Sequence, residues 1–354
     1  MRARLKTPLC WGLGFLFSCL FIWGVSAVFL NGITPKTWDE AVGRYVNTPG
    51  AVIRHRSEGW ADLRVARHGL TPEGDRIFFS PVPKFLLWGD SYAEGIQVGA
   101  QSRAVNVYNA RALEGMPRGV AVADSGLAVA DYYFYLPRYE KLTENVRAHV
   151  ILLAGMRAVM PSQQLDCHSR FLPDPWRFEA SECEPSEAAL RYGEAISRRR
   201  LDFLHAVYRS AADYRLRFCV GNLSQDRPVV ERATPGPTSG ELREAWTFLL
   251  GEFKKLTGAR IIFFYTPLRP ALRGGSILFE APEEQAHKAL FAELCARSGV
   301  GFVDLAPAFL GLYEREGRLA MGFFNTPQGS GHLNAAGQAI IADGLYRAFS
   351  GGAK

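Results

Sequence analysis

The sequence has few of the features that mark metal, nucleotide or nucleic-acid sites. Its six cysteines form no CxxC pair and no Cys/His spacing suited to a metal ion. It contains no P-loop, no zinc-finger spacing and no evident base-stacking platform. Internal repeats and low-complexity segments are absent as well. These absences predict a folded globular protein that needs no metal or other cofactor and binds no nucleic acid.

The chain is long and apolar enough for one large core. Its 354 residues are 48% hydrophobic, which suits a domain of roughly 250–300 residues with appendages. The formal net charge is +6, and the densest basic stretch is Arg198–Arg200, followed by Arg209, Arg215 and Arg217. Such a stretch is typical of a solvated helix face, and contact with anionic lipid or an acidic polymer is the alternative.

The first 30 residues have the pattern of a membrane anchor. Arg2, Arg4 and Lys6 precede Leu9–Leu30, a run of 22 residues without charge. As a helix this run would be roughly 33 Å long, enough to cross the hydrocarbon core. The leading cations favour a cytoplasmic N-terminus and place the rest of the chain outside, in the periplasm. A cleavage site at Val25-Ser26-Ala27, which would make the segment a signal peptide, is the alternative.

Residues 31–83 contain turn signals and only short apolar runs, which predicts a stem and an edge layer. From residue 84 to about 350, short apolar runs alternate with helical stretches. The predicted strands cover residues 85–88, 119–123, 149–154, 260–265 and 301–303. The predicted helices cover about 102–114, 131–144, 241–256, 283–297 and 335–349. This alternation predicts a mostly parallel five-stranded sheet with helices on either side.

An insertion at about 156–238 separates the third and fourth predicted strands. Insertions of this kind usually carry specificity rather than core stability. Cys167 and Cys183 are close enough in sequence to form a disulfide in an oxidising compartment, and free thiols are the alternative. Cys219 and Cys295 lie in apolar surroundings typical of buried thiols. Trp176 is a candidate for stacking on a sugar ring, although packing is the commoner role of such a residue.

Two residues far apart in the sequence have the chemistry of a hydrolytic site. Ser91 follows the first predicted strand, in Trp88-Gly89-Asp90-Ser91-Tyr92, and His332 precedes the last predicted helix, in Gly331-His332-Leu333-Asn334. In open α/β sheets, ligands bind beyond the carboxyl ends of the strands. A serine hydroxyl barely ionises at neutral pH, but a neighbouring imidazole can take its proton. Of the seven histidines, only His332 occupies a turn beyond the last predicted strand, so we predict that it pairs with Ser91.

At these residues the chain resembles the SGNH (GDSL-type) hydrolases, over about residues 84–350 with the insertion unmatched. Gly89-Asp90-Ser91 resembles the first block of the family, whose serine is the nucleophile. Asp124-Ser125-Gly126 resembles the second block, whose glycine N–H contributes to the oxyanion hole, and His332 matches the histidine of the last block. The resemblance implies a three-layer α/β/α fold of flavodoxin-like type. It also implies ester chemistry through an acyl-enzyme, with the oxyanion held by the amides of Ser91 and Gly126.

The family's catalytic aspartate is missing from its usual place. It normally stands three residues before the histidine, where this chain has Gly329. The resemblance therefore implies either a Ser-His dyad or another group in the role of the acid. Asn325, Gln328 and Ser330 are close in sequence but carry no charge. Asp304 is a more distant option that better suits a cap after the fifth strand.

The third block of the family is also altered, because its asparagine is replaced at face value by Arg157. Arg157 either stabilises the oxyanion or points into solvent. Losing an oxyanion donor typically costs about 100- to 1000-fold in rate, so weak or absent catalysis stays open. Gly89 and Asp90 are expected to support the nucleophile, with Asp90 accepting hydrogen bonds from amides of the turn.

The prediction is a membrane-anchored serine esterase or O-acyltransferase that faces the periplasm. The resemblance extends to members that handle acyl groups, often acetyl, on cell-surface or secreted polysaccharides. It implies a glycan ester as substrate and polysaccharide-modification proteins as partners. A catalytically silent SGNH-like module that binds a glycan or scaffolds a complex is the alternative from another class. Hydrolysis of lipid esters is a third possibility.

Overall fold

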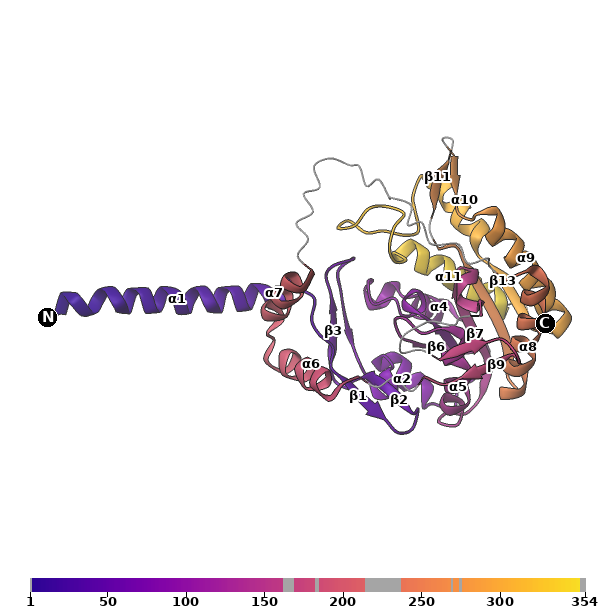
Figure 1. The fold of residues 1–354 in the computed structure, drawn as a ribbon, viewed down its shortest axis with the longest axis horizontal. Coiled ribbons are helices and arrows are strands. Elements are labelled where there is room, and N and C mark those ends of the chain that lie inside the picture. The colour runs from indigo at the N-terminus through magenta and orange to yellow at the C-terminus, as the bar shows by residue number, and fades with distance from the viewer. Residues whose placement is uncertain are drawn as a thin grey trace.

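One sheet of five parallel strands forms the centre of the fold (Figure 1). The computed structural model describes residues 2–161, 169–181, 185–213, 237–268, 270–273 and 276–350. The strands are β5 (Lys84–Gly89), β6 (Arg118–Ala123), β7 (Val146–Ala154), β10 (Arg260–Thr266) and β13 (Gly301–Asp304). The five predicted strands are thereby confirmed. Their order, β13-β10-β7-β5-β6, is that of a flavodoxin-like doubly wound sheet, with the switch point between β5 and β7.

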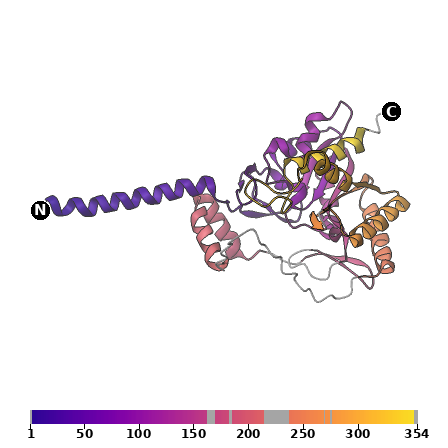
Figure 2. The same cartoon turned by 90° about the horizontal axis from the view of Figure 1, so that it is seen from above.

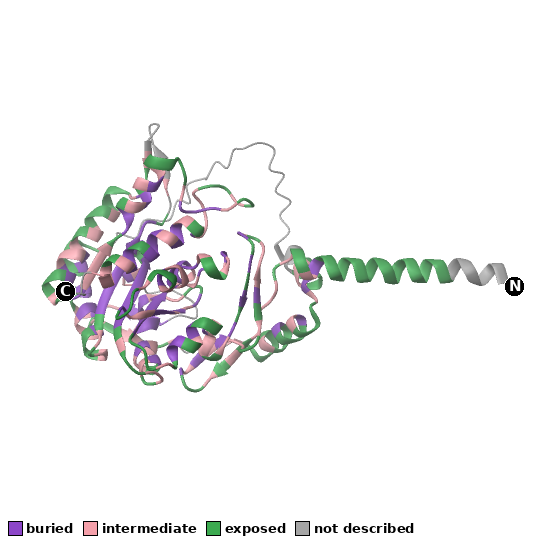
Figure 3. Cartoon of the chain, turned by 180° about the vertical axis from the view of Figure 1, so that it is seen from behind, coloured by how far each residue is buried: buried purple, intermediate pink, exposed green. Residues whose placement is uncertain are grey.

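Strand β5 shows why these segments are strands. All six of its residues are buried, as expected for a short apolar run covered on both faces. Successive side chains point to opposite faces, so Leu86 and Trp88 enter one core while Phe85 and Leu87 enter the other. Figure 3 shows the buried sheet between more exposed helices.

Helices cover both faces of the sheet and complete the three layers. The core that contains Trp88 includes α5 (Val129–Glu140), α8 (Ser239–Leu256) and α9 (Pro282–Ser298). The core that contains Phe85 includes α4 (Ala104–Arg111), α10 (Ala306–Glu316) and α11 (Ala335–Ser350). The five predicted helices are confirmed. The sequence analysis does not predict α10, nor α2 (Pro72–Phe78), which packs into the Trp88 core through Ile77 and Phe78.

Two small hairpins precede the central sheet. The first pairs β1 (Lys36–Asp39) with β2 (Arg44–Asn47), and the second pairs β3 (Val52–His55) with β4 (Ala61–Arg64). Each hairpin is a two-stranded sheet separate from the central one. Val42 and Val46 of the first hairpin nevertheless belong to the core that contains Trp88. Residues 31–83 therefore contribute to the packing of the domain.

The N-terminal helix α1 (Arg2–Phe29) projects away from the domain, with its inner end beside α6 (Glu187–Arg199) and α7 (Asp202–Asp213) (Figures 1 and 2). Its Leu9–Phe29 segment is the one described helix long and apolar enough to cross a membrane, a test that a signal sequence also passes. The remaining elements are η1 (Arg67–Gly69), α3 (Ser91–Glu94), η2 (Ala100–Ser102), η3 (Met156–Val159), β8 (Arg170–Leu172), β9 (Arg177–Glu179), β11 (Ala271–Arg273) and β12 (Ser276–Leu278).

The structure describes some of the cysteines but not all of them. Cys295 is buried without a disulfide partner, as the sequence predicts, and burial raises the pKa of its thiol to about 12. The proposed bridge between Cys167 and Cys183 lies outside the described residues, as does Cys219.

Candidate active site

Ser91 stands at a tight turn between β5 and the short helix α3. The turn is tight because Gly89 has no side chain: a Cβ there would lie 2.4 Å from the Cβ of Ala93. Asp90 is the N-cap of α3, and its carboxylate accepts a hydrogen bond from the Tyr92 amide at 2.9 Å. Burial raises the pKa of Asp90 above its usual value. Gly89 and Asp90 thus support the turn, and the Ser91 side chain lies beyond the carboxyl end of β5.

His332 reaches Ser91 from the loop before α11. Its Nε2 lies 2.9 Å from Ser91 Oγ, although 241 positions separate the two residues in the sequence. The loop is fixed on both sides of the imidazole. Tyr92 donates its hydroxyl to the Gly331 carbonyl at 3.2 Å, and the Asn334 side chain accepts the amide of Ala336 at the start of α11. The structure therefore brings the two predicted residues within hydrogen-bond distance.

The second nitrogen of His332 faces a carboxylate that sequence reasoning misses. His332 Nδ1 lies 2.5 Å from Glu58 Oε2, and the backbone amide of His332 donates to Glu58 Oε1. Glu58 lies in the turn between β3 and β4, within the segment predicted to be a stem. Ser91, His332 and Glu58 form a continuous chain of hydrogen bonds of the Ser-His-acid type.

Glycines in the histidine loop leave room for Glu58. Gly331 has a φ of +74°, and a Cβ on it would lie 1.9 Å from Glu58 Oε1. Gly329 occupies the place of the family's aspartate, with a φ of +78° and a hypothetical Cβ 2.8 Å from Leu319 Cδ1. A side chain at residue 329 would be strained and crowded, so the carboxylate comes from another part of the chain.

Asn325, a predicted supporting residue, fixes the turn that carries Glu58. Its Oδ1 accepts the Gly59 amide at 2.9 Å, and its Nδ2 donates to the Arg56 carbonyl at 2.8 Å. Gln328, the other predicted supporting residue, is exposed and makes only a 3.4 Å contact with the Phe323 carbonyl. Asn325 therefore holds the turn that carries Glu58, whereas Gln328 makes no described bond to that turn.

Replacing Asn325 with alanine is expected to lower kcat for an ester substrate about 10- to 100-fold. The loss is expected because the turn that carries Glu58 loses its hydrogen bonds at Arg56 and at Gly59. A misplacement of about 1 Å in an active site can lower the rate about 100-fold. The measurement is steady-state hydrolysis of p-nitrophenyl acetate by the full-length protein. Gln328→Ala is the matched control and should keep its rate within about twofold. Equal rates for both variants would contradict the positioning role.

The same turn is attached to the end of α1. Asn31 Oδ1 accepts the Ser57 amide at 3.0 Å, and Arg56 Nε donates to the Val28 carbonyl at 2.8 Å. His55 on β3 lies nearby, and burial together with the positive field of His332 lowers the pKa of His55. Because a neutral His55 carries no charge, it does not compete with His332 for the Glu58 carboxylate.

Two of the predicted oxyanion residues, Gly126 and Arg157, line a small cavity. Gly126 follows β6 with a φ of +89°, a conformation that suits glycine. Asp90, Gly126 and Arg157 all line a cavity of about 280 Å³, together with Phe171 and Leu268. The Arg157 side chain is exposed, and the described residues give it no hydrogen bond or ion pair.

A charged cluster connects helix α3, which begins at Ser91, to the loop that contains Gly126. Ser125 Oγ donates to Glu94 Oε2 at 2.6 Å, so the last residue of α3 contacts the residue before Gly126. Asp124 lies beside them, 3.2 Å from Arg44 and 3.4 Å from Lys36. Burial, reinforced by the negative charge of Asp124, raises the pKa of Glu94 to about 7.

Replacing Glu94 with glutamine is expected to stabilise the protein above pH 7 and to change little near pH 5. The folded-state pKa of about 7 exceeds the ordinary value of 4.5, so wild-type stability falls as pH rises between these values. Since one pKa unit corresponds to about 1.4 kcal/mol, the gain is at most about 3 kcal/mol. Thermal unfolding at pH 5 and pH 8 measures it. A gain that is equal at both pH values would contradict the assignment.

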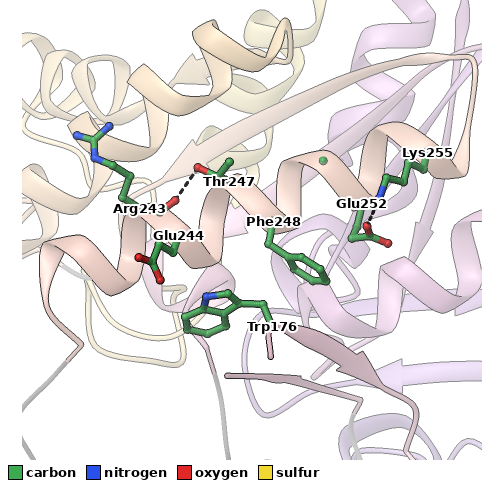
Figure 4. A pocket seen from close by; sticks show the side chains of 8 residues that line it. Trp176, Arg243, Glu244, Thr247, Phe248, Glu252 and Lys255 are labelled. Carbon is green, nitrogen blue, oxygen red and sulfur yellow. Dashed lines mark hydrogen bonds and ion pairs between the residues drawn. The ribbon is translucent and has the colours of Figure 1, made fainter. Parts of the chain in front are cut away.

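A second cavity lies between α8 and the β8–β9 hairpin of the insertion (Figure 4). Its volume is about 510 Å³, and Trp176 and Phe248 supply its aromatic surface. Arg243, Glu244 and Lys255 stand around them. Phe171 belongs to both regions, because it lines the smaller cavity while its ring lies 5.5 Å from that of Trp176. The groove is thus a neighbour of the cavity beside Gly126.

The other proposed stand-ins for the acid lie elsewhere. Asp304 accepts the Ala306 amide at 2.9 Å and pairs with Lys288 at 2.8 Å, so it holds the turn that leads from β13 into α10. Ser330 donates its hydroxyl to the Pro327 carbonyl at 2.8 Å. In the structure, the carboxylate beside His332 Nδ1 belongs to Glu58.

No protein-family model matches the chain, and no curated protein matches it. Among solved structures, LAE5, an alpha/beta hydrolase enzyme from the metagenome of Lake Arreo, matches at 16% identity with a TM-score of 0.41, over 77% of this chain and 98% of that one. An extracellular lipase from Streptomyces rimosus matches at 16% identity with a TM-score of 0.37, over 75% and 99% of the two chains. The acetylxylan esterase Axe2 from Geobacillus stearothermophilus matches at 13% identity with a TM-score of 0.38, over 76% and 95%. These scores and identities are too low to indicate a function, so the proposed function depends on the chain's own residues.

Proposed function

We propose that the chain is an SGNH-type serine esterase or O-acyltransferase. The observation that carries the proposal is the hydrogen-bonded chain of Ser91, His332 and Glu58, with 2.9 Å between Oγ and Nε2 and 2.5 Å between Nδ1 and Oε2. In this proposal Ser91 is the nucleophile, His332 is the general base and Glu58 orients the imidazole. These three residues come from separate segments of the sequence, and separate hydrogen bonds hold each segment in place.

The reaction follows from the order of these groups. Ser91 Oγ attacks the ester carbonyl while His332 Nε2 takes its proton, and the Glu58 carboxylate stabilises the resulting imidazolium. The amides of Ser91 and Gly126 hold the oxyanion. His332 then gives the proton to the departing alcohol, which leaves an acyl group on Ser91. Water or a sugar hydroxyl, deprotonated by the same imidazole, releases that acyl group and restores the enzyme.

The surfaces near the site accommodate an acyl group on a glycan. The cavity beside Gly126 measures about 280 Å³, which is ample for an acetyl group. The neighbouring groove offers Trp176 and Phe248 with charged and hydroxyl side chains around them, a combination suited to sugar rings (Figure 4). We therefore propose an acylated polysaccharide at the cell surface as substrate, handled together with polysaccharide-modification proteins.

The proposed location is the extracytoplasmic side of a membrane, with α1 as an uncleaved anchor. The last turns of α1 support this placement because they are packed. Ser26 is buried, and Val28 and Asn31 hold the hairpin that carries Glu58. Cleavage near Ala27 would either remove Val28, which accepts a hydrogen bond from Arg56, or make Val28 part of a free N-terminus.

Active-site labelling and substrate comparison test this proposal on the full-length protein in detergent. A fluorophosphonate probe should label Ser91, and the label should be found on its peptide by mass spectrometry. Hydrolysis of p-nitrophenyl acetate should exceed that of p-nitrophenyl laurate, and an acetylated oligosaccharide should release acetate or transfer it to an added sugar. Laurate as the better substrate would instead indicate a lipid esterase.

The silent glycan-binding module is the second candidate. It is favoured by the exposed Arg157, because the third oxyanion donor of the family has no replacement among the described contacts. It predicts no fluorophosphonate labelling and no turnover, together with binding of an oligosaccharide by isothermal titration calorimetry. The ordered Ser91–His332–Glu58 chain is the reason that we place the enzyme first.

Replacing Trp176 with alanine tests the role of the groove. We expect KM for an acetylated oligosaccharide to rise about 10-fold, because an aromatic contact is worth up to about 1.5 kcal/mol. The rate with p-nitrophenyl acetate should stay within about twofold, since that substrate is too small to reach the groove. Trp38→Ala is the matched control, because Trp38 is a half-exposed indole that packs on Tyr45 in the first hairpin. An unchanged oligosaccharide KM in the Trp176 variant would contradict the role.

A further inference from the structure

The α6–α7 hairpin is attached to the inner end of α1. The Trp23 indole donates to the Arg199 carbonyl at 3.4 Å, and Asp202 at the start of α7 pairs with Arg54 of β3 at 3.0 Å. The hairpin is thus bonded to both α1 and the domain. Figures 1 and 2 show α7 at the inner end of α1, with α6 next to α7.

The level of this contact along α1 locates the hairpin relative to a membrane. The candidate span is Leu9–Phe29, and Trp23 lies inside it. About 9 Å of helix axis separates Trp23 from Phe29, at about 1.5 Å per residue. Helices that lie on a membrane bury their apolar face about 5–10 Å into the boundary between headgroups and acyl chains. The hairpin is therefore at the depth of an interfacial helix.

Helix α7 presents large apolar side chains that the domain leaves uncovered. Phe203 is 41% exposed, Leu204 54%, Val207 48% and Tyr208 63%. Their spacing places them on one side of the helix, while Asp202 on the other side is buried. Monomeric soluble proteins seldom expose such a group of residues together, and a patch of this kind marks a binding surface.

Cations and aromatic residues accompany the patch. The side chains of Arg198, Arg199 and Arg200 are all exposed at the C-terminal end of α6. Trp60 is 47% exposed, and its ring meets the ring of Phe29 edge-on at 5.5 Å. Tryptophan is enriched at the level of lipid headgroups, and arginine is attracted by their phosphates. The surface beside the end of α1 therefore has the composition of a membrane-contacting surface.

We propose that the α6–α7 hairpin docks on the phospholipid bilayer that α1 crosses, with the apolar side of α7 inserted and the long side chains of Arg198–Arg200 extending from the interface toward the phosphate layer. This inference rests on the proposed anchoring by α1 and does not depend on the reaction. Continuity with the apolar surface of α1, together with the positive charge, selects lipid as the occupant. Since β3 pairs with Asp202, docking also holds the Glu58 hairpin near the membrane surface.

Site-specific photocrosslinking in the full-length protein tests the proposal. Benzoylphenylalanine replaces Leu204 or Tyr208 in protein reconstituted into vesicles of phosphatidylethanolamine and phosphatidylglycerol. Phe15 in the middle of α1 is the positive control, and Thr247 is the negative control because it is exposed on α8, on the side of the domain away from α1 (Figure 1). Mass spectrometry identifies the adduct. We expect lipid adducts at residues 204 and 208 within about threefold of the yield at residue 15 and at least about tenfold above residue 247.

Each other outcome overturns the inference in a recognisable way. Lipid adducts at residue 15 without any at 204 or 208 would retain the anchor and remove the hairpin from the membrane. Adducts to a second copy of the chain would show that protein covers α7 instead. A lack of lipid adducts at residue 15 would overturn the anchor as well. Thermal unfolding of each variant confirms that the domain is folded, and fluorophosphonate labelling of Ser91 in the wild-type protein reports separately on the proposed reaction.

Discussion

Replacing Ser91 with alanine is expected to lower kcat for p-nitrophenyl acetate by about 10⁶-fold. In the proposed mechanism the acyl group is carried on Ser91 Oγ, so the variant has no nucleophile and retains only oxyanion binding. Loss of the nucleophile in a serine hydrolase of this type costs about 2 × 10⁶ in kcat. The measurement is a progress curve at high enzyme concentration, with the fluorophosphonate probe as a second readout. Labelling and turnover should disappear together.

A second serine provides the control for this prediction. Ser330→Ala alters the same loop as His332, but the Ser330 hydroxyl bonds only to the Pro327 carbonyl among the described contacts. Its kcat should remain within about threefold of wild type. If the Ser91 variant kept its activity while the fold stayed intact, the nucleophile would have to be sought elsewhere and the proposed mechanism would be wrong.

The fold could be predicted largely because each element has a local cause. Runs such as Phe85–Trp88 are apolar throughout, which indicates strands buried on both faces. Thr238 and Glu241 form a capping box where α8 begins, close to the predicted start at residue 241. Helix α10 is not predicted because it begins within a few residues of the end of β13. In the sequence, the short strand and the helix therefore look like one apolar stretch. The short strands of the N-terminal hairpins likewise give weak periodicity.

Ser91 and His332 could be paired because topology places both at the same edge of the sheet. A position after the first strand and a position before the last helix must lie beyond the carboxyl ends of parallel strands. Glu58 carries no such signal. It is one of 35 acidic residues and lies in a turn between two four-residue strands, 274 positions from His332. Only the packing of that hairpin against the histidine loop reveals it.

The interpretation of Arg157 required side-chain geometry as well. Its position in the sequence allows either an oxyanion donor or a solvated cation, and the backbone path is the same in both cases. The structure places Arg157 beside the cavity with an exposed side chain. Sequence alone could not place this side chain, because its conformation depends on its surroundings rather than on the backbone path.

Replacing Glu58 with glutamine is expected to lower kcat by about 10⁴-fold with little change in KM. The carboxylate accepts from His332 Nδ1 and from the His332 backbone amide, so it fixes both the tautomer and the orientation of the ring. A carboxamide of equal size can direct its NH₂ group at Nδ1, which favours the wrong tautomer, and it cannot stabilise the imidazolium. The equivalent Asp-to-Asn change in a serine protease triad lowers kcat about 10⁴-fold. Steady-state kinetics with p-nitrophenyl acetate measures the loss.

Two further variants make this result specific to Glu58. Glu58→Asp keeps the charge on a shorter side chain, so its rate should fall between wild type and the glutamine variant. Asp304→Asn removes a carboxylate that holds the turn into α10 and pairs with Lys288, so its kcat should stay within about threefold. A loss of less than about tenfold in Glu58→Gln would mean that Ser91 and His332 act as a dyad. The close contact of Gly331 with Glu58 would then reflect packing of the hairpin rather than catalysis, because a carboxylate that orients and stabilises the imidazole cannot be neutralised at so small a cost.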